Sequence, residues 1–530
     1  MKSLSHYGVY IPTHSVIGLK IKCKGKEFEL SLAGEQMAIA FVRKFDTPYT
    51  QDETFVQNFI ADFATELISS SVGFKDQVKG NIGFKDFDFS AVKEYLEKVK
   101  TLTQSMTKQE KKKATELKKT IRDMLKEKYG FAIVDGDRIP LMNWISEPSG
   151  IFMSRGLNPL RGRWKRSITK DSITLNISKA PDDLDTGWAN IVWKPDEMWI
   201  ASWKSPLDGK MKYVWFSPTT GIRQDKERKK FSLASQLGNE LCKLEKYIEK
   251  ELGSSDIERR KLSTAVYLIK SLAIRVGDEK LAGEHGTVGC TTLKKDNVTI
   301  EGNKVHLSFI GKDYVKLERD LIVPEKVKKN LVEFIKEARE SYLFKDINSE
   351  KIAKFLREKI PGLSAKVFRT YIAGTVWDEH AKENLKMISD ETSVPVKKYL
   401  FKLTNLEVAK KLNHRKALPK NYEERLAKKK LQLETEKIKL DLIKKGEYKK
   451  IQAQIRKAEK IACEFELLRD TTEWNLGTSL TSYISPIKVQ DFCQKAHLEL
   501  QEVYSKGLLD KFSWISDQGK KRCGKYLCKR

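Results

Sequence analysis

The chain has 530 residues, of which 40% are hydrophobic, so it is long enough for roughly two to four domains with ordinary cores. Lysine and arginine exceed aspartate and glutamate by 100 to 72, and the resulting net charge of +28 predicts a polyanionic partner, most often nucleic acid. The sequence has no apolar stretch long enough to span a bilayer, no signal peptide and no C-x-x-C pair. We therefore expect an intracellular protein with free thiols, no membrane segment and no structural metal.

The first half of the chain predicts a mixed α/β region. Apolar and polar residues alternate through 19–30 around Gly25, which predicts a β-hairpin with one wet face. Residues 93–130 are basic and carry an apolar stripe at helical spacing, so we expect a helical region whose charged face is either solvated or directed at DNA. A basic loop follows at 150–168. The tryptophan-rich run around 206–209 predicts a strand hairpin in a half-buried sheet.

A change in composition separates the two halves. Between residues 217 and 230 polarity rises and hydrophobic periodicity lapses, and we expect a domain boundary there. Apolar spacing over 257–280 predicts a helix with Arg275 at its end, where the side chain can point into a cleft. Residues 304–323 form the clearest predicted hairpin, with Lys312 in its turn. A lysine at such a tip is usually exposed to solvent, but beside DNA it could reach into a groove.

Helices are predicted through the rest of the second half. One begins near residue 365 and places Arg369 in its first turns. Residues 405–424 predict another, with His414 just before a helix stop at 418–419. The charged stretch 421–470 has apolar residues at spacings of seven, four and three, interrupted once, which indicates two amphipathic helices folded into an antiparallel coiled-coil hairpin.

The segment LGTSLTSYISP centres on Tyr483. A tyrosine hydroxyl is a weak nucleophile at neutral pH because its pKa is about 10. It can attack a phosphodiester where cations stabilise the extra negative charge of the transition state. Most of the 17 tyrosines will be packing residues. The interpretation of Tyr483 therefore depends on the cationic candidates that the fold brings to it: Arg275, Lys312, Arg369 and His414.

The segments around these candidates are LAIRVGDEK, FIGKDYV, AKVFRTYIAG, LNHRKALPK and LGTSLTSYISP. In this order they closely resemble the active-site motifs of type IB DNA topoisomerases of the eukaryotic nuclear kind. The charged helical hairpin at 421–470 falls between the last two, where that family has its linker. Upstream, residues 34–59, 127–139 and 150–159 look like parts of the family's N-terminal cap. The resemblance covers almost the whole chain.

The resemblance implies an α+β fold that forms a two-lobed clamp around double-stranded DNA and acts as a monomer. Its parts would be a mixed α/β N-terminal DNA-binding cap at 1–225, a mainly α catalytic core of the tyrosine recombinase/topoisomerase IB type at 226–420, an antiparallel coiled-coil linker at 421–470, and a C-terminal domain at 471–530. The last part would return Tyr483 to the pocket.

Carried over motif by motif, Tyr483 would be the nucleophile, which forms a 3′-phosphotyrosyl bond and releases a 5′-hydroxyl. Arg275, Arg369 and His414 would hold the non-bridging phosphate oxygens, on which charge grows during the reaction. Lys312 would protonate the leaving 5′-oxygen. Because the ester bond stores the energy of the cut, the enzyme would relax supercoils of either sign without ATP, metal or another cofactor.

The resemblance also suggests supporting DNA contacts. Arg155 would approach base edges beside the cut, and Lys165 would touch a phosphate. Asp313 and Asn413 would help to align the pocket. For each of these residues, a surface or helix-capping role is an equal alternative.

Three departures from the family pattern affect these expectations. Ser482 precedes the tyrosine where nuclear enzymes usually have asparagine, which puts sensitivity to camptothecin-type poisons in doubt. Asp278 replaces the usual asparagine in RVGDEK, which we interpret as a neutral change. The long charged N-terminal region with nuclear-import signals has no counterpart, and the linker is short. These features predict a prokaryotic version, such as an archaeal one, that works in the cytoplasm at the nucleoid; the alternative location is the nucleus.

Two other functions compete with this interpretation. A tyrosine recombinase would use the same residue types, but the cap-like first half and the coiled-coil linker argue against it. A non-catalytic DNA-architectural protein would need a decayed site, whereas the motifs here are intact.

Overall fold

The computed structural model describes residues 1–71, 73–153, 158–278, 287–338, 342–419, 421–443 and 447–515, without the side chain of Asp313. The chain mixes helix and strand and divides into two compact units. Unit 1 holds residues 1–223, and unit 2 holds the described residues from Gln224 onward. The division falls in the first turn of helix α6 (Gly221–Glu251), within the stretch where polarity rises. No helix among the described residues is long and apolar enough to cross a membrane.

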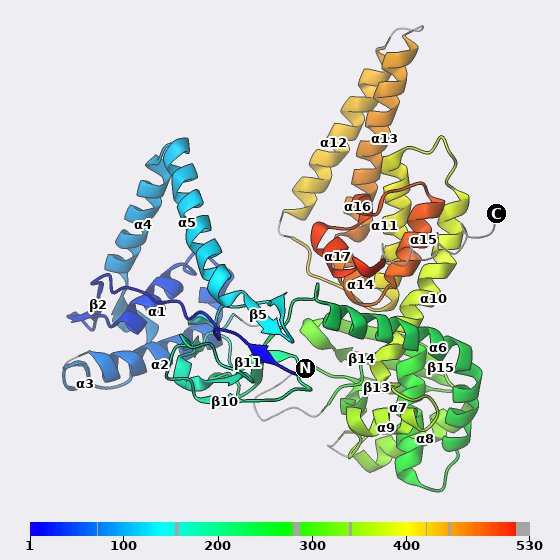
Figure 1. Cartoon of the computed structure of the whole chain (residues 1–530), viewed down its shortest axis with the longest axis horizontal. Helices are drawn as coiled ribbons and strands as arrows, with labels where there is room; N and C mark the ends of the chain where they lie inside the picture. Colours follow the sequence, from blue (N-terminus) through cyan, green and yellow to red (C-terminus); the bar gives the residue numbers. More distant parts are fainter. Residues whose placement is uncertain are drawn as a thin grey trace. The chain divides into compact units, whose positions relative to one another are not determined.

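Unit 1 is built from small sheets and helices (Figure 1). Its strands are β1 (Leu4–Ser5), β2 (Lys20–Cys23), β3 (Lys26–Glu29), β4 (Phe87–Asp88), β5 (Phe131–Val134), β6 (Asp137–Pro140), β7 (Gly150–Ile151), β8 (Trp164–Lys165), β9 (Ile173–Asn176), β10 (Asn190–Val192), β11 (Trp199–Lys204) and β12 (Met211–Trp215). Its helices are α1 (Leu32–Val42), α2 (Glu53–Ser70), α3 (Phe74–Gln77), α4 (Ser90–Ser105) and α5 (Lys108–Tyr129).

Both hairpins predicted in unit 1 are confirmed. Strands β2 and β3 pair antiparallel around Gly25, and Ile21 and Phe28 face each other in the core. Strands β11 and β12 also pair antiparallel, within a sheet of order β10-β9-β11-β12. Trp199 and Trp203 are buried there, as expected for aromatic residues on the inner face of a half-buried sheet.

The basic region 93–130 is helical as predicted, but it forms two helices. Helix α5 starts at a capping box in which Thr107 and Glu110 satisfy each other's backbone N–H groups. This new helix start separates α5 from α4. Much of the expected apolar stripe is exposed; for example, Leu117 is 62% exposed. The predicted loop at 150–168 is interrupted by β7 and β8, which pair antiparallel.

Unit 2 contains most of the helices and one antiparallel sheet of order β13-β14-β15 (Figure 1). After α6 come α7 (Ile257–Leu272), β13 (Val298–Glu301), β14 (Lys304–Ile310), β15 (Lys316–Ile322), α8 (Glu325–Ala338), α9 (Ser349–Arg357), α10 (Ala365–Lys386) and α11 (Val394–Lys411). The chain continues with α12 (Tyr422–Asp441), α13 (Tyr448–Thr471), α14 (Leu476–Ser482), α15 (Pro486–Lys495), α16 (Leu500–Val503) and α17 (Lys506–Lys511).

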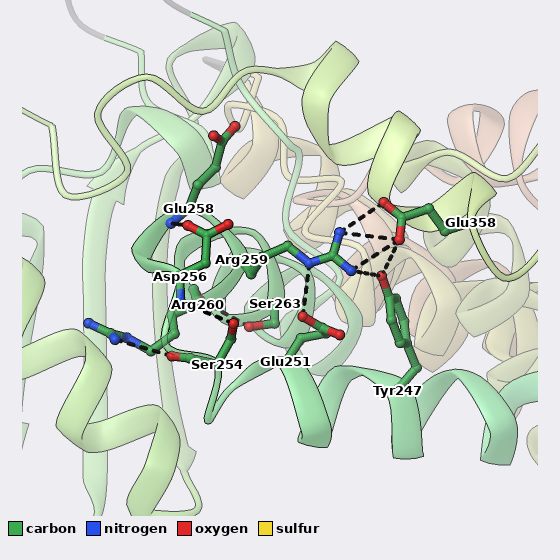
Figure 2. Close-up of polar contacts among 9 residues, drawn as sticks. All are labelled: Tyr247, Glu251, Ser254, Asp256, Glu258, Arg259, Arg260, Ser263 and Glu358. Atoms are coloured by element: carbon green, nitrogen blue, oxygen red, sulfur yellow. Dashed lines mark hydrogen bonds and ion pairs between the residues drawn. The ribbon is translucent and has the colours of Figure 1, made fainter.

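An arginine network fixes the start of α7 (Figure 2). The Arg259 guanidinium donates to the Glu251 carboxylate at 2.9 Å and to the Tyr247 hydroxyl at 2.9 Å. It also pairs with Glu358 at 3.0 Å, and the Tyr247 hydroxyl donates to the same carboxylate at 2.6 Å. These contacts join α6, α7 and the residue that follows α9. The helix that leads to Arg275 is therefore held firmly at its start.

Helices α12 and α13 pack against each other in opposite directions (Figure 1). Lys429 in α12 pairs with Glu464 in α13 at 2.6 Å, whereas Glu436, further along α12, accepts from the earlier residue Gln454 at 2.8 Å. Contacts that move forward along one helix and backward along the other define an antiparallel pair. Both helices predicted for residues 421–470 are present.

The C-terminal helices α14 to α17 share a hydrophobic cluster with α10 and α11. Phe512 and Trp514 are each 2% exposed, so the sequence-based expectation that they are packing residues is confirmed. Tyr483 and Ile484 belong to the same cluster. The segment around Tyr483 is therefore an integral part of unit 2.

Candidate active site

Arg275 lies just beyond α7. The helix ends at Leu272, because Ala273 adopts a left-handed conformation with φ of 54°. The expectation that the helix would reach Arg275 was therefore wrong, and Arg275 lies outside it. Its carbonyl accepts a hydrogen bond from the Cys290 N–H at 2.9 Å, and its side chain is exposed.

Two glycines allow separate backbone segments to meet beside Arg275. Gly277 has φ of 79°, and a Cβ atom there would lie 2.8 Å from the Cα atom of Gly289. A Cβ atom on Gly289 would lie 2.5 Å from the Cα atom of Gly277. Thr291 donates its backbone N–H to Val276 at 2.8 Å and its hydroxyl to the Gly277 carbonyl at 2.6 Å. Only glycine fits this approach, which fixes the backbone next to Arg275.

Lys312 lies in the turn of the predicted hairpin, which the structure confirms. Strands β14 and β15 pair antiparallel, and a single turn of 3₁₀ helix at Lys312–Tyr314 joins them. The Gly311 N–H closes the turn by donating to the Val315 carbonyl at 2.8 Å. The Lys312 side chain is exposed.

Arg369 lies in the second turn of α10, and it is only 5% exposed. Its guanidinium donates to the carbonyls of Ala273 and of Leu412, the latter at 3.0 Å. Its Nε atom is buried and has no hydrogen-bond partner among the described residues. Burial lowers the pKa of Arg369, and the nearby Tyr483 opposes that effect. An arginine remains protonated throughout, so this position holds a buried cation with an unused donor.

His414 lies beyond the end of α11. The helix stops at Lys411, and Asn413 has φ of 55°, so the predicted stop at 418–419 was placed too late. His414 is 6% exposed. Its Nε2 atom lies 3.3 Å from Nη2 of Arg369, and its Nδ1 atom lies 2.9 Å from the Ser479 hydroxyl.

These contacts determine which nitrogen of the His414 ring carries the proton. Because an arginine only donates, Nε2 of His414 must accept, and Nδ1–H then donates to Ser479. Burial, followed by the charges of Arg369 and Arg275, lowers the pKa of His414 to about 3. The ring is therefore neutral at neutral pH in this structure.

Tyr483 follows the last residue of α14 and is 5% exposed. Its ring centroid lies 5.2 Å from that of His414 and 5.1 Å from Cζ of Arg369. Burial alone would raise the pKa of the Tyr483 phenol, but the charges of Arg369 and Arg275 outweigh burial and lower it. The surroundings thus stabilise the phenolate, the more nucleophilic form, relative to that of an ordinary tyrosine.

A pocket of about 380 Å³ joins these groups. Its lining includes Arg275, Lys312, Arg369 and Tyr483. His414 is not part of the lining, but it contacts both Arg369 and Tyr483. The structure therefore brings together all the catalytic candidates proposed from the sequence, although they come from distant parts of unit 2. A phenol surrounded by cations suits the binding and attack of a phosphodiester.

The supporting candidates are less concentrated. Lys165, in unit 1, forms an ion pair with Glu147 at 2.9 Å. Asn413 donates its side-chain amide to the Lys316 carbonyl at 3.2 Å, which links the end of α11 to the hairpin that carries Lys312. Arg155 and the side chain of Asp313 lie outside the described residues.

Two site residues were not identified from the sequence. Lys366 lines the pocket and contributes to the lowered pKa of Tyr483. Ser479 is fully buried and holds the His414 ring. Helical spacing contained the signal, because Lys366 precedes Arg369 by three positions and Ser479 precedes Tyr483 by four.

Among the residues that the structure describes, no group of three or more His, Cys, Asp or Glu side chains could hold a metal ion.

Three protein-family models together match most of the chain. Residues 1–216 match the model described as "Eukaryotic DNA topoisomerase I, DNA binding fragment", and 219–447 match "Eukaryotic DNA topoisomerase I, catalytic core". Residues 455–521 match "C-terminal topoisomerase domain". All of these models describe parts of eukaryotic-type topoisomerases.

Curated relatives agree with these models. DNA topoisomerase 1 beta of Arabidopsis thaliana is 30% identical over 97% of this chain and 58% of its own length. DNA topoisomerase 1 of Homo sapiens is 29% identical over 97% of this chain and 71% of its own. DNA topoisomerase 1 of Candidozyma auris is 32% identical over 83% of this chain and 59% of its own. The chain spans little more than half the length of the Arabidopsis and Candidozyma proteins.

The chain belongs to the eukaryotic DNA topoisomerase I family, the type IB topoisomerases. The resemblance read from the motifs is thereby confirmed.

Proposed function

We propose that the chain relaxes supercoiled DNA by transiently cutting one strand through a covalent bond to Tyr483. The observation that carries this proposal is the contact of Tyr483 with two cationic or basic neighbours. Its ring lies 5.1 Å from the Arg369 guanidinium carbon and 5.2 Å from the His414 ring, at a pocket that Arg275 and Lys312 also line.

The reaction exchanges one phosphoester for another. The Tyr483 oxygen attacks the phosphorus and forms the 3′-phosphotyrosyl bond, while its proton is lost to water. The bond from phosphorus to the 5′-oxygen breaks, and Lys312 gives that oxygen a proton. Reversal of these steps reseals the strand after it has rotated, and the ester conserves the energy of the bond, so ATP has no role.

Arg275, Arg369 and His414 stabilise the charge that grows on the non-bridging oxygens. The position of Arg369 supports this role, because its side chain lines the pocket beside Tyr483. His414 accepts at Nε2 in the structure without DNA, so it must carry a second proton to donate there to a phosphate. An anionic phosphate beside the ring favours this protonation.

The partner in this proposal is double-stranded DNA, which the net charge of +28 and the match of unit 1 to a DNA-binding fragment support. We assign residues 1–225 to a cap, 226–420 to the catalytic core, 421–470 to a coiled-coil linker and 471–530 to a C-terminal domain, which together form a clamp on DNA as a monomer. Arg155, Lys165, Asp313 and Asn413 serve as supporting contacts. The eukaryotic origin of the relatives named above favours the nucleus over the cytoplasm.

Relaxation of a negatively supercoiled plasmid in EDTA without ATP tests the proposal. The wild-type protein should relax the plasmid and leave a denaturant-stable adduct on its 3′ end, whereas Tyr483→Phe should bind DNA and do neither, because it lacks the attacking oxygen. Equal relaxation by both proteins would show that Tyr483 is not the nucleophile. DNA binding without relaxation by the wild type would contradict the proposed activity itself.

A further inference from the structure

The helix that precedes Tyr483 is held at its carboxyl end by lysine side chains. Lys230 Nζ donates to the Ser482 carbonyl at 3.0 Å, and Lys511 Nζ donates to the Thr481 carbonyl at 2.6 Å. The last carbonyls of a helix have no N–H partner within the helix. Here cations supply the missing donors, and they do so at the two residues immediately before Tyr483.

Glu227 joins the two lysines. Its carboxylate lies 2.6 Å from Lys230 Nζ and 3.5 Å from Lys511 Nζ. The side chains of Lys230, Lys511 and Glu227 are 17%, 14% and 26% exposed. Removing charges from water is costly, and apolar side chains of similar volume would often fill such a site at no loss of stability. A charged cluster kept at such a site can instead fix the position of the backbone carbonyls that it binds.

The same face of α6 also contacts α17 and the residues just after it. Gln224 donates to the Ser513 hydroxyl at 3.1 Å and to the Asp510 carbonyl at 3.3 Å. Arg228 lies over the ring of Trp514, with 5.1 Å from its Cζ atom to the ring centroid. These contacts hold α17, whose last residue is Lys511, so both lysines reach α14 from well-anchored elements.

Glu227 and the two lysines carry opposite charges that stabilise each other, whereas the lysines repel each other. Burial alone would raise the pKa of the Glu227 carboxyl, but Lys230 and Lys511 outweigh burial and lower it. Burial lowers the pKa of Lys230, while Glu227 opposes that effect.

We propose that Lys230, Lys511 and Glu227 form a clasp that positions Tyr483 for attack and for resealing. The inference rests on the proposed role of Tyr483 as the nucleophile. The phenol must meet the phosphorus in line, hold the 3′ end while the free 5′ end rotates, and then present the phosphorus again to the 5′-hydroxyl. A clasp on the Thr481 and Ser482 carbonyls fixes the backbone from which the phenol projects. These are positioning residues, because none of them lines the pocket.

Single-turnover cleavage tests the clasp. The substrate would be a duplex whose short fragment downstream of the cut, which carries the 5′-hydroxyl, dissociates after cleavage. At saturating DNA it reports the cleavage rate, and fluorescence anisotropy reports the Kd. Lys230→Met keeps the aliphatic bulk but removes the donor, and we expect it to slow cleavage about 10- to 100-fold, as a small misplacement of a reacting group does. Its Kd should stay within about twofold of the wild type, because Lys230 is not one of the residues that line the pocket.

Matched variants separate positioning from other causes. Lys230→Arg should recover most of the rate, because it restores a cationic donor. Lys229→Met removes the same charge from the exposed neighbouring position and should cleave like the wild type. If Lys230→Met does not fold, Lys511→Met offers the same measurement from the other side of the clasp. A loss of rate matched by an equal loss of affinity, with no rescue by arginine, would overturn the inference.

The outcomes also separate the inference from the proposed function. Wild-type cleavage with unchanged rates in both Lys230→Met and Lys511→Met would overturn the clasp alone. Absence of cleavage in the wild type would overturn the proposed function, and the clasp with it.

Discussion

The floor and the rim of the pocket are built differently. We use "floor" for Arg369, His414 and Tyr483, which are each at most 6% exposed, and "rim" for Arg275 and Lys312, whose side chains are exposed. The floor groups contact one another and backbone carbonyls. Such preorganised groups need little rearrangement when charge develops. The rim groups project from backbone that is held by close contacts beside Arg275 and by the closed turn at Lys312.

We expect substitution of a rim residue to slow cleavage strongly but to leave the stability of the fold almost unchanged. Lys312→Met should slow single-turnover cleavage by about 10²–10⁴-fold, the usual contribution of a general acid. Because Lys312 is exposed, the free energy of unfolding should change by less than about 0.5 kcal/mol. Denaturant unfolding monitored beside the cleavage assay gives both values.

A substrate change sharpens this prediction. A duplex with sulfur in place of the 5′-bridging oxygen has a leaving group that needs no proton, so it should restore cleavage by Lys312→Met. The same duplex should not restore cleavage by a variant of the floor. Failure to rescue Lys312→Met would contradict its role as the acid.

We expect substitution of a floor residue to slow cleavage less strongly and also to lower the stability of the fold. Arg369→Met should slow cleavage by about 10²–10³-fold, as removal of a transition-state donor does. It also leaves the buried carbonyls of Ala273 and Leu412 without their donor, which should lower the free energy of unfolding by about 1–3 kcal/mol. An Arg369→Met protein as stable as the wild type would remove the distinction between floor and rim.

The remaining difference is the dependence of stability on pH, which leaves the cleavage rate aside. The pKa of His414 is lowered to about 3 in the folded protein, against an ordinary value of 6.5. Between these values the unfolded chain binds a proton that the folded chain does not, so the free energy of unfolding falls as pH drops from about 6.5 toward 3. His6, buried in unit 1 with a pKa lowered to about 4, acts in the same direction.

A variant isolates the contribution of His414. Between pH 4 and 6, His414→Asn should show a shallower slope of unfolding free energy against pH, by up to about 1.4 kcal/mol per pH unit. His6→Asn serves as the matched control in unit 1. Identical slopes in wild type and His414→Asn would show that the imidazole titrates normally in the fold.

The sequence contained the elements of the site but not their burial. Periodicity identified the helix that leads to Arg275 and the hairpin that carries Lys312, because both patterns are local. The motifs identified Arg275 and Arg369 alike. Nothing local distinguishes an arginine exposed at the rim from one buried in the floor, since burial depends on contacts such as that between Arg369 and Leu412, which are 43 residues apart.

Helix ends and long-range partners were also beyond the sequence. Ala273 and Asn413 end their helices with positive φ, a conformation that propensities assign mainly to glycine. The bond from Lys230 to the Ser482 carbonyl joins residues 252 positions apart. Composition cannot reveal such a pair, because any of the 100 lysines and arginines could be the donor.

The α12–α13 hairpin is closed where it leaves the rest of unit 2, and this affects how freely its length can vary. Backbone bonds close the chain there, from the Lys416 N–H to the Glu473 carbonyl at 2.8 Å and from the Asn475 N–H to the His414 carbonyl at 2.7 Å. The chain entropy lost in closing a loop grows only with the logarithm of its length. Whole helical turns can therefore be inserted or deleted at the far tip of the pair at little thermodynamic cost. The spacing between His414 and Tyr483 along the sequence is thus free to drift while their spacing in the fold stays constant.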